Sequence, residues 1–81
     1  MANEIKDITK RAAEDMKKNG ILSRGTYFDI VDHALNGEKF SVQMSAYDVA
    51  KMRQRFTRRH LNGVMHQHST KNGSFIVSFN Q

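Results

Sequence analysis

The amino-acid sequence predicts an α+β fold with two N-terminal helices, a short strand, a long basic helix and a C-terminal β-hairpin. Four Asn-Gly pairs divide the chain, and each pair suits a helix end or a hairpin turn. Apolar residues recur at helical spacing in three segments and with a period of two elsewhere. The chain has no proline, which permits uninterrupted helices, and its 81 residues suit a single small domain, residues 1–81.

The first helix is expected over residues 3–18. Asn3 is its expected N-cap, and Asn19-Gly20 is its expected stop. The apolar stripe of this helix, with members three or four residues apart, consists of Ile5, Ile8, Ala12 and Met16.

A shorter helix is expected over residues 27–36, because Thr26 followed by Asp29 resembles a capping box. Its buried stripe is expected to consist of Tyr27, Ile30, Val31, Ala34 and Leu35. Residues 38–44 then alternate between apolar and polar side chains, which predicts a short strand.

The third helix is expected over residues 46–61. Ser45 is a strong N-cap candidate with Asp48 at the third helical position, and Asn62-Gly63 is the expected stop. The apolar stripe of this helix consists of Val49, Met52 and Phe56.

Residues 64–70 and 74–80 predict a β-hairpin in one of two registers. A two-residue turn places His66 and His68 opposite Phe79 and Val77. A three-residue loop with Gly73 in the left-handed conformation places Met65 and Gln67 there instead. A slip of one residue moves every side chain to the other face, so the choice decides where both histidines lie. We prefer the second register because its apolar face is cleaner.

A long basic helix that leads directly into a two-stranded hairpin resembles the recognition helix and wing of winged-helix DNA-binding domains. The resemblance covers about residues 26–80 and is one of topology. It implies that the helix contacts DNA and that the hairpin tip touches the sugar-phosphate backbone or the minor groove. The sequence departs from the pattern in one respect, because winged helices usually have two helices after the first strand and only one can be placed here.

The positive charge is confined to the second half of the chain. Residues 1–37 contain six acidic and six basic residues, so that half is neutral. Residues 38–81 contain seven basic and two acidic residues, which gives the whole net charge of +5. This asymmetry indicates a face for a polyanion or for an acidic partner protein.

The candidate binding residues lie mostly on the third predicted helix. At 100° per residue, Lys51, Arg55 and Arg58 fall within one arc together with Arg59, whereas Arg53 lies on the far flank of the apolar stripe. Arginine forks suit phosphates and base edges. The full set is Lys51, Arg53, Gln54, Arg55, Arg58, Arg59 and, at the hairpin tip, Lys71. The alternative is a solvated helix face that only keeps the protein soluble.

Other chemistry has little support in the sequence. His60, His66 and His68 suggest a metal triad, but few acids and no cysteine accompany them, so no metal or cofactor is expected. No nucleophile triad, phosphate-binding glycine loop or carboxylate pair is recognisable, so we expect no enzyme activity. The aromatic residues expected in the core are Tyr27, Phe28, Phe40, Phe75 and Phe79.

Three functional hypotheses follow from the charge pattern. The first is a small nucleic-acid-binding protein with regulatory or accessory function, with duplex DNA favoured. The second is an inhibitor or adaptor, in the style of small phage or mobile-element proteins, that fits the acidic groove of a nucleic-acid-handling protein. The third is self-association through sheet edges into a homodimer. Because no signal-like or membrane-length apolar segment is present, the expected location is the cytoplasm, away from membranes.

Overall fold

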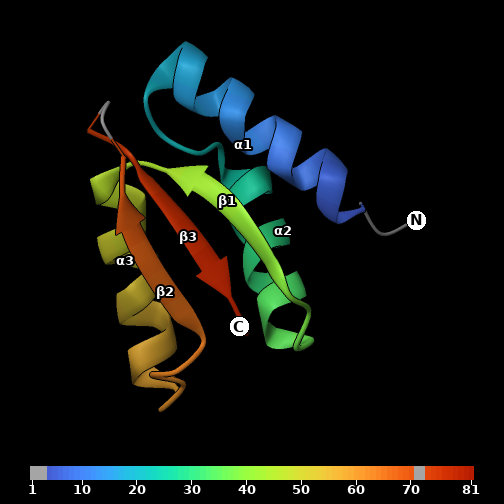
Figure 1. Cartoon of the computed structure of the whole chain (residues 1–81), viewed down its shortest axis with the longest axis vertical. Coiled ribbons are helices and arrows are strands. Elements are labelled where there is room, and N and C mark those ends of the chain that lie inside the picture. The colour runs from blue at the N-terminus through green and yellow to red at the C-terminus, as the bar shows by residue number, and fades with distance from the viewer. Residues whose placement is uncertain (1–3, 71–72) are drawn as a thin grey trace.

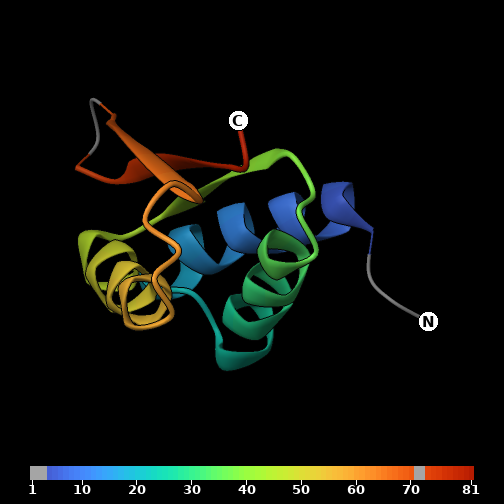
Figure 2. The same ribbon diagram turned by 90° about the horizontal axis from the view of Figure 1, so that it is seen from below.

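The computed structural model describes residues 4–70 and 73–81, and it shows an antiparallel sheet with helices on one of its faces (Figures 1 and 2). The order of elements is the one predicted, so the α+β fold class is confirmed. In chain order the elements are α1 (Ile5–Asn19), α2 (Arg24–Leu35), β1 (Phe40–Met44), α3 (Ala46–Arg58), β2 (Met65–Ser69) and β3 (Phe75–Phe79).

The sheet has the order β1-β3-β2, so the C-terminal strand is central. Gln67 pairs with Val77 and Met65 pairs with Phe79, which confirms the preferred hairpin register. This register turns Met65, Val77 and Phe79 toward the helices, where all three are buried. His66 and His68 therefore lie on the opposite, exposed face of the sheet.

Phe79 joins the sheet to α3. Its ring is fully buried, stacks on Phe40 of β1 at 4.8 Å between centroids and meets Phe56 of α3 at 6.3 Å. Met52 and Val49 are buried on the same side of α3, as the apolar stripe predicts. The helix is thus fixed by one face, and the opposite face is left to solvent (Figure 2).

The start of α2 differs from the sequence prediction. The helix begins at Arg24 with Ser23 as its N-cap, and the Thr26 backbone N–H donates to the Ser23 hydroxyl at 3.3 Å. Thr26 is therefore the third helical residue rather than the cap. Ser23 is held in place by Asp15 of α1, which accepts its backbone N–H at 3.0 Å. This contact between distant segments is invisible to a local capping rule.

The end of α3 also differs from the prediction. The helix stops at Arg58, three residues earlier than expected. His60 adopts the left-handed conformation at φ 60°, and the Leu61 N–H donates to the Phe56 carbonyl while the His60 N–H donates to that of Thr57. This is a Schellman arrangement with histidine in the position usually taken by glycine. The stop is therefore not made by Asn62-Gly63.

The remaining boundaries are close to those predicted. Gly20 ends α1 in a left-handed conformation at φ 73°, and the Ile8 and Ala12 stripe is buried. The N-cap position is held by Glu4, whereas the expected cap Asn3 lies outside the described residues. A single helix, α3, separates β1 from β2, so the departure from the winged-helix pattern remains. No helix in the described part of the chain is long and apolar enough to cross a membrane.

Candidate polyanion-binding surface

The exposed face of α3 carries most of the predicted binding residues. Lys51, Gln54 and Arg58 are exposed, and Arg55 is half-buried on the flank that faces α2. Arg55 and Arg58 occupy the last turn of the helix, where positive charge is favoured by the helix dipole. Arg59 follows directly as the C-cap residue and is also exposed.

The acid of α3, Asp48, does not neutralise this face because its side chain is only 2% exposed. It points inward, where its carboxylate accepts the Leu22 backbone N–H at 2.8 Å and the Ser45 hydroxyl at 2.8 Å. The Ser45 hydroxyl in turn caps α3 by accepting the Asp48 N–H at 3.1 Å. Asp48 therefore joins the α1–α2 connection to the start of α3, and the exposed side chains of α3 include no carboxylate.

Arg55 is held by aromatic rings of α2 rather than by an acid. Its guanidinium carbon lies 5.3 Å from the centroid of Phe28 and 5.7 Å from that of Tyr27, and its Nε donates to the Tyr27 hydroxyl at 3.3 Å. A cation over a ring is attracted by the π-electron density but keeps its full charge. Arg55 is thereby oriented without being neutralised, and its terminal Nη donors are not used in this contact.

Lys51 and Arg24 continue the same arrangement on either side of Arg55. The Lys51 ammonium lies 4.7 Å from the Tyr27 centroid and 5.7 Å from that of Tyr47. The Arg24 guanidinium lies 5.7 Å from the Phe28 centroid. Cations and rings thus alternate across α2 and α3, in a set that we call the cation–ring row: Arg24, Phe28, Arg55, Tyr27, Lys51 and Tyr47.

Arg53 leaves α3 on the opposite flank, as the helical wheel predicts. Its Nε and Nη2 donate to the Gln67 side-chain oxygen of β2 at 3.1 and 2.7 Å. The structure therefore separates Arg53 from the cation–ring row by the width of the helix. Gln67 uses an amide oxygen for this contact, so Arg53 also keeps its charge.

A shallow groove of about 250 Å³ runs between α2 and α3 over part of this surface. The groove brings together four of the predicted cations and one predicted polar residue with a ring at its wall. Its lining consists of Tyr27, Lys51, Gln54, Arg55, Arg58 and Arg59. Lys71, the candidate at the hairpin tip, lies outside the described residues, so its relation to the groove is not defined.

Sequence reasoning missed four members of the cation–ring row: Arg24, Tyr27, Phe28 and Tyr47. Tyr47 is 62% exposed and Phe28 is 38% exposed, although Phe28 was expected in the core. Tyr47 precedes Lys51 by four residues and Arg24 precedes Phe28 by four, a spacing at which side chains meet on a helix. The first pair could have been found from the sequence. The second required the correct start of α2.

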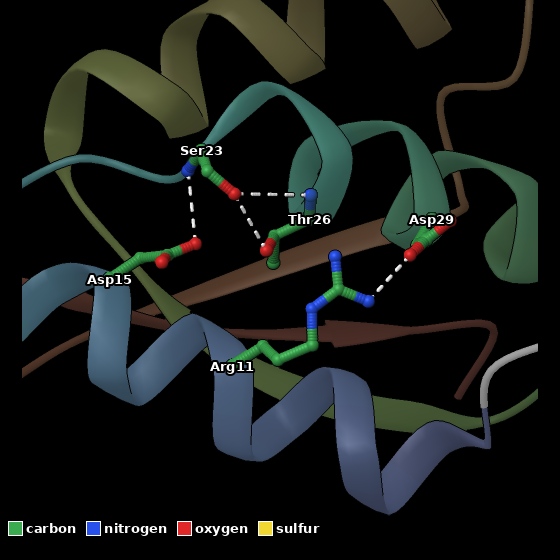
Figure 3. Close-up of polar contacts among 5 residues, drawn as sticks. All are labelled: Arg11, Asp15, Ser23, Thr26 and Asp29. Atoms are coloured by element: carbon green, nitrogen blue, oxygen red, sulfur yellow. Dashed lines mark hydrogen bonds and ion pairs between the residues drawn. The ribbon is translucent and has the colours of Figure 1, made fainter.

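The junction between α1 and α2 has the opposite electrostatic character (Figure 3). Arg11 of α1 forms an ion pair with Asp29 of α2 at 2.7 Å. Partial burial pushes the pKa of Asp15 upward, but hydrogen bonds from the Ser23 N–H and from the Thr26 and Ser23 hydroxyls outweigh it. The nearby positive charge of Arg11 acts in the same direction, so the pKa of Asp15 lies below its ordinary value. Acids and bases balance each other here.

The histidines are dispersed over the surface. His60 follows α3, whereas His66 and His68 lie on the exposed face of the sheet. No group of three histidine, aspartate or glutamate side chains is placed to hold a metal ion among residues 4–70 and 73–81.

Comparison with protein-family models, curated proteins and solved structures found no match to this chain. We therefore infer what the surface binds from its own geometry and charges.

Proposed function

We propose that this protein binds nucleic acid, with duplex DNA as the favoured ligand, through the exposed face of α3 and the cation–ring row. The observation that carries the proposal is that these cations are held by rings and an amide rather than by carboxylates. An arriving phosphate therefore meets charge that is already oriented and not yet neutralised. A protein that binds nucleic acid without catalysing a reaction on it would act as a regulatory or accessory factor.

Electrostatics supports a polyanion as the ligand. The cations of α3 lie close together and repel one another in the free protein, and a phosphate backbone relieves that repulsion. Ring contacts also limit the rotamers of Lys51 and Arg55, so less side-chain entropy remains to be lost on binding. The uncompensated charge and the restricted rotamers of these side chains therefore both favour binding of a polyanion.

The dimensions of α3 suit a duplex. Thirteen residues give a rod of roughly 20 Å, and a B-DNA major groove about 12 Å wide admits one helix. The exposed residues lie along this rod from Tyr47 to Arg58. The helix could therefore present side chains to base edges and phosphates at the same time.

Fluorescence anisotropy with labelled oligonucleotides tests the proposal. Duplex and single-stranded DNA of equal length and an RNA hairpin should be titrated at several salt concentrations. Because binding releases condensed counterions, we expect affinity to fall steeply with salt, with a slope near −0.9 per phosphate contact on duplex DNA. Absence of binding to all three ligands at about 50 mM salt, where such contacts are strong, would contradict it.

A matched pair of charge reversals locates the binding face. Arg55→Glu with Arg58→Glu changes the net charge by the same amount as Lys6→Glu with Lys10→Glu, and the two lysines are exposed on α1. We expect the α3 variant to lose at least about 100-fold in affinity, because two cations that attract the polyanion become anions that repel it. The α1 variant should stay within about threefold of the unmodified protein. Equal losses would assign the binding to net charge alone.

A protein partner is the second candidate, and the exposed rings of Phe28 and Tyr47 favour it. Aromatic residues beside arginine are enriched at protein interfaces, and an acidic groove that normally accepts DNA would complement the same surface. Affinity capture from nuclease-treated lysate separates the two candidates. A stoichiometric protein lost in the Arg55→Glu, Arg58→Glu variant would favour the inhibitor or adaptor hypothesis.

A further inference from the structure

The cationic and amide side chains of α3 fall into two sets. Lys51, Arg53 and Arg55 each contact rings or an amide of a neighbouring element. Gln54 and Arg58 are exposed and make no side-chain hydrogen bond, ion pair or ring contact within residues 4–70 and 73–81. The three cations that contact neighbouring elements lie on the two flanks of α3, and Gln54 and Arg58 lie between these flanks.

Gln54 and Arg58 also lie on the exposed face of the helix. They are four residues apart, so one lies above the other on the same face. Ala50 and Thr57, both exposed and short, lie beside them on a broad, shallow surface that begins at Tyr47. Because these neighbours are short, the helix backbone can approach a ligand closely at this point, within reach of the longer side chains of Gln54 and Arg58.

Their chemistry matches base edges in the major groove. A glutamine amide can bond to adenine N6 and N7 together, and an arginine fork can bond to guanine O6 and N7. Such contacts demand a particular orientation, which an untied side chain can adopt without breaking an existing contact. Phosphates accept from many directions, so a cation already held over a ring can serve them as it stands.

We infer that the α3 face divides recognition between its two sets of side chains. Gln54 and Arg58 read bases in the major groove, while Lys51 and Arg55 on one flank and Arg53 on the other contact the two phosphate backbones. The inference rests on the proposed function and adds that binding is sequence-specific, with Gln54 and Arg58 as the residues that contact bases. Four residues rise about 6 Å along the helix, and each base pair rises about 3.4 Å along the duplex. The two base pairs contacted by Gln54 and Arg58 are therefore either adjacent or separated by one intervening base pair.

Selection of binding sites from a randomised duplex library tests the inference. The unmodified protein should enrich sites with a guanine and an adenine at most two base pairs apart. Arg58→Ala should abolish the guanine preference at one position, and Gln54→Ala should abolish the adenine preference at the other. Each loss of discrimination should be about 5- to 100-fold, as one bidentate base contact provides.

Two further variants separate base reading from charge. Arg58→Lys keeps the charge but loses the fork, so it should lose the guanine preference while keeping affinity for unrelated sequences within about threefold. Lys51→Met should weaken every sequence alike and make the salt slope about 0.9 less steep, because one phosphate contact is lost. Both substitutions are on the exposed face, and thermal melts by circular dichroism control for folding.

The outcomes also distinguish this inference from the proposed function. If the protein binds duplexes with a salt dependence but enriches no sequence, nucleic-acid binding stands and base reading is overturned. The same conclusion follows if Arg58→Lys and Gln54→Ala leave an enriched sequence unchanged. If no nucleic acid binds at low salt, both proposals fail.

Discussion

Arg11 and Arg55 are both half-buried arginines that reach toward helix α2, and they meet opposite chemistry there. Arg11 meets the carboxylate of Asp29, whereas Arg55 meets the rings of Tyr27 and Phe28. The three residues of α2 are consecutive in the chain, so neighbouring positions serve two surfaces of different character. The first surface is neutralised, and the second keeps its charge.

The contrast does not lie in how firmly each arginine is held. An exposed or half-exposed ion pair contributes about 0.2–1 kcal/mol, and a cation–π contact near the surface contributes about 0.5–1 kcal/mol. The two contacts are therefore similar in energy, but only the ion pair cancels charge. The placement of acids, more than that of bases, determines which side of α2 can attract a polyanion.

Asp48 links the two regions and gives the largest expected effect on stability. Asp48→Ala would leave the buried Leu22 N–H without its acceptor and remove a partner of Ser45, so we expect a loss of about 2–3 kcal/mol. Ser45→Ala, which removes only the N-cap hydroxyl, should cost about 1 kcal/mol. Urea unfolding followed by circular dichroism measures both. A loss below about 0.5 kcal/mol for Asp48→Ala would show that this link is dispensable.

Exchanging each arginine for methionine tests the comparison itself. Arg55→Met should lower duplex affinity by about 5- to 10-fold, as expected for one lost phosphate contact, and change stability by less than about 0.5 kcal/mol. Arg11→Met should leave affinity unchanged and lower stability by up to about 1 kcal/mol. Anisotropy and urea unfolding on both variants give the four values. A loss of affinity in Arg11→Met would break the distinction between the regions.

The neutralised region should also impose a pH dependence. Since the pKa of Asp15 is lower in the folded state than in the unfolded chain, its ionised form stabilises the fold above the unfolded value near 3.9. That contribution is lost as pH falls through the lower, folded pKa. Asp15→Asn should therefore be less stable by under about 1 kcal/mol at pH 7, and the difference should shrink between about pH 5 and pH 2. A constant difference in urea titrations across this range would contradict the assignment.

Tyr27→Phe should give the smallest effect. The substitution removes the hydroxyl that accepts from Arg55 but keeps the ring beneath Arg55 and Lys51. We expect a loss of affinity of no more than about threefold, within the net contribution of one hydrogen bond. Tyr27→Leu, which also removes the ring, is the comparison variant and should lose more. Equal losses in the two variants would assign the positioning of Arg55 to the hydroxyl alone.

Much of the helical and strand structure could be predicted from local patterns. Ser45 and Asp48 mark the start of α3, and the alternation in residues 38–44 marks β1. The errors fall at two helix ends. α2 begins at Arg24 with Ser23 as its N-cap, and the Ser23 N–H donates to Asp15 of α1. α3 ends at Arg58 because the Leu61 and His60 N–H groups close a Schellman turn with His60 in the left-handed conformation.

The candidate surface could be predicted only in part. Lys51, Arg55 and Arg58 share one arc by helical geometry alone, and the structure places them there. The inward turn of Asp48 could not be predicted, because it depends on a backbone N–H contributed by Leu22, 26 residues away. The rings of Tyr27 and Phe28 likewise reach Arg55 only because α2 packs beside α3.

The sequence by itself determined the order of elements and the charge asymmetry, because capping, periodicity and composition act over a few residues. The sequence left two hairpin registers open and favoured one, and the tertiary structure settled the choice, since this register buries Met65 beside Phe79 and leaves His66 and His68 exposed. The tertiary structure also decided which charges meet a partner: packing places Asp29 against Arg11 and turns Asp48 inward, so the cations of α3 remain uncompensated.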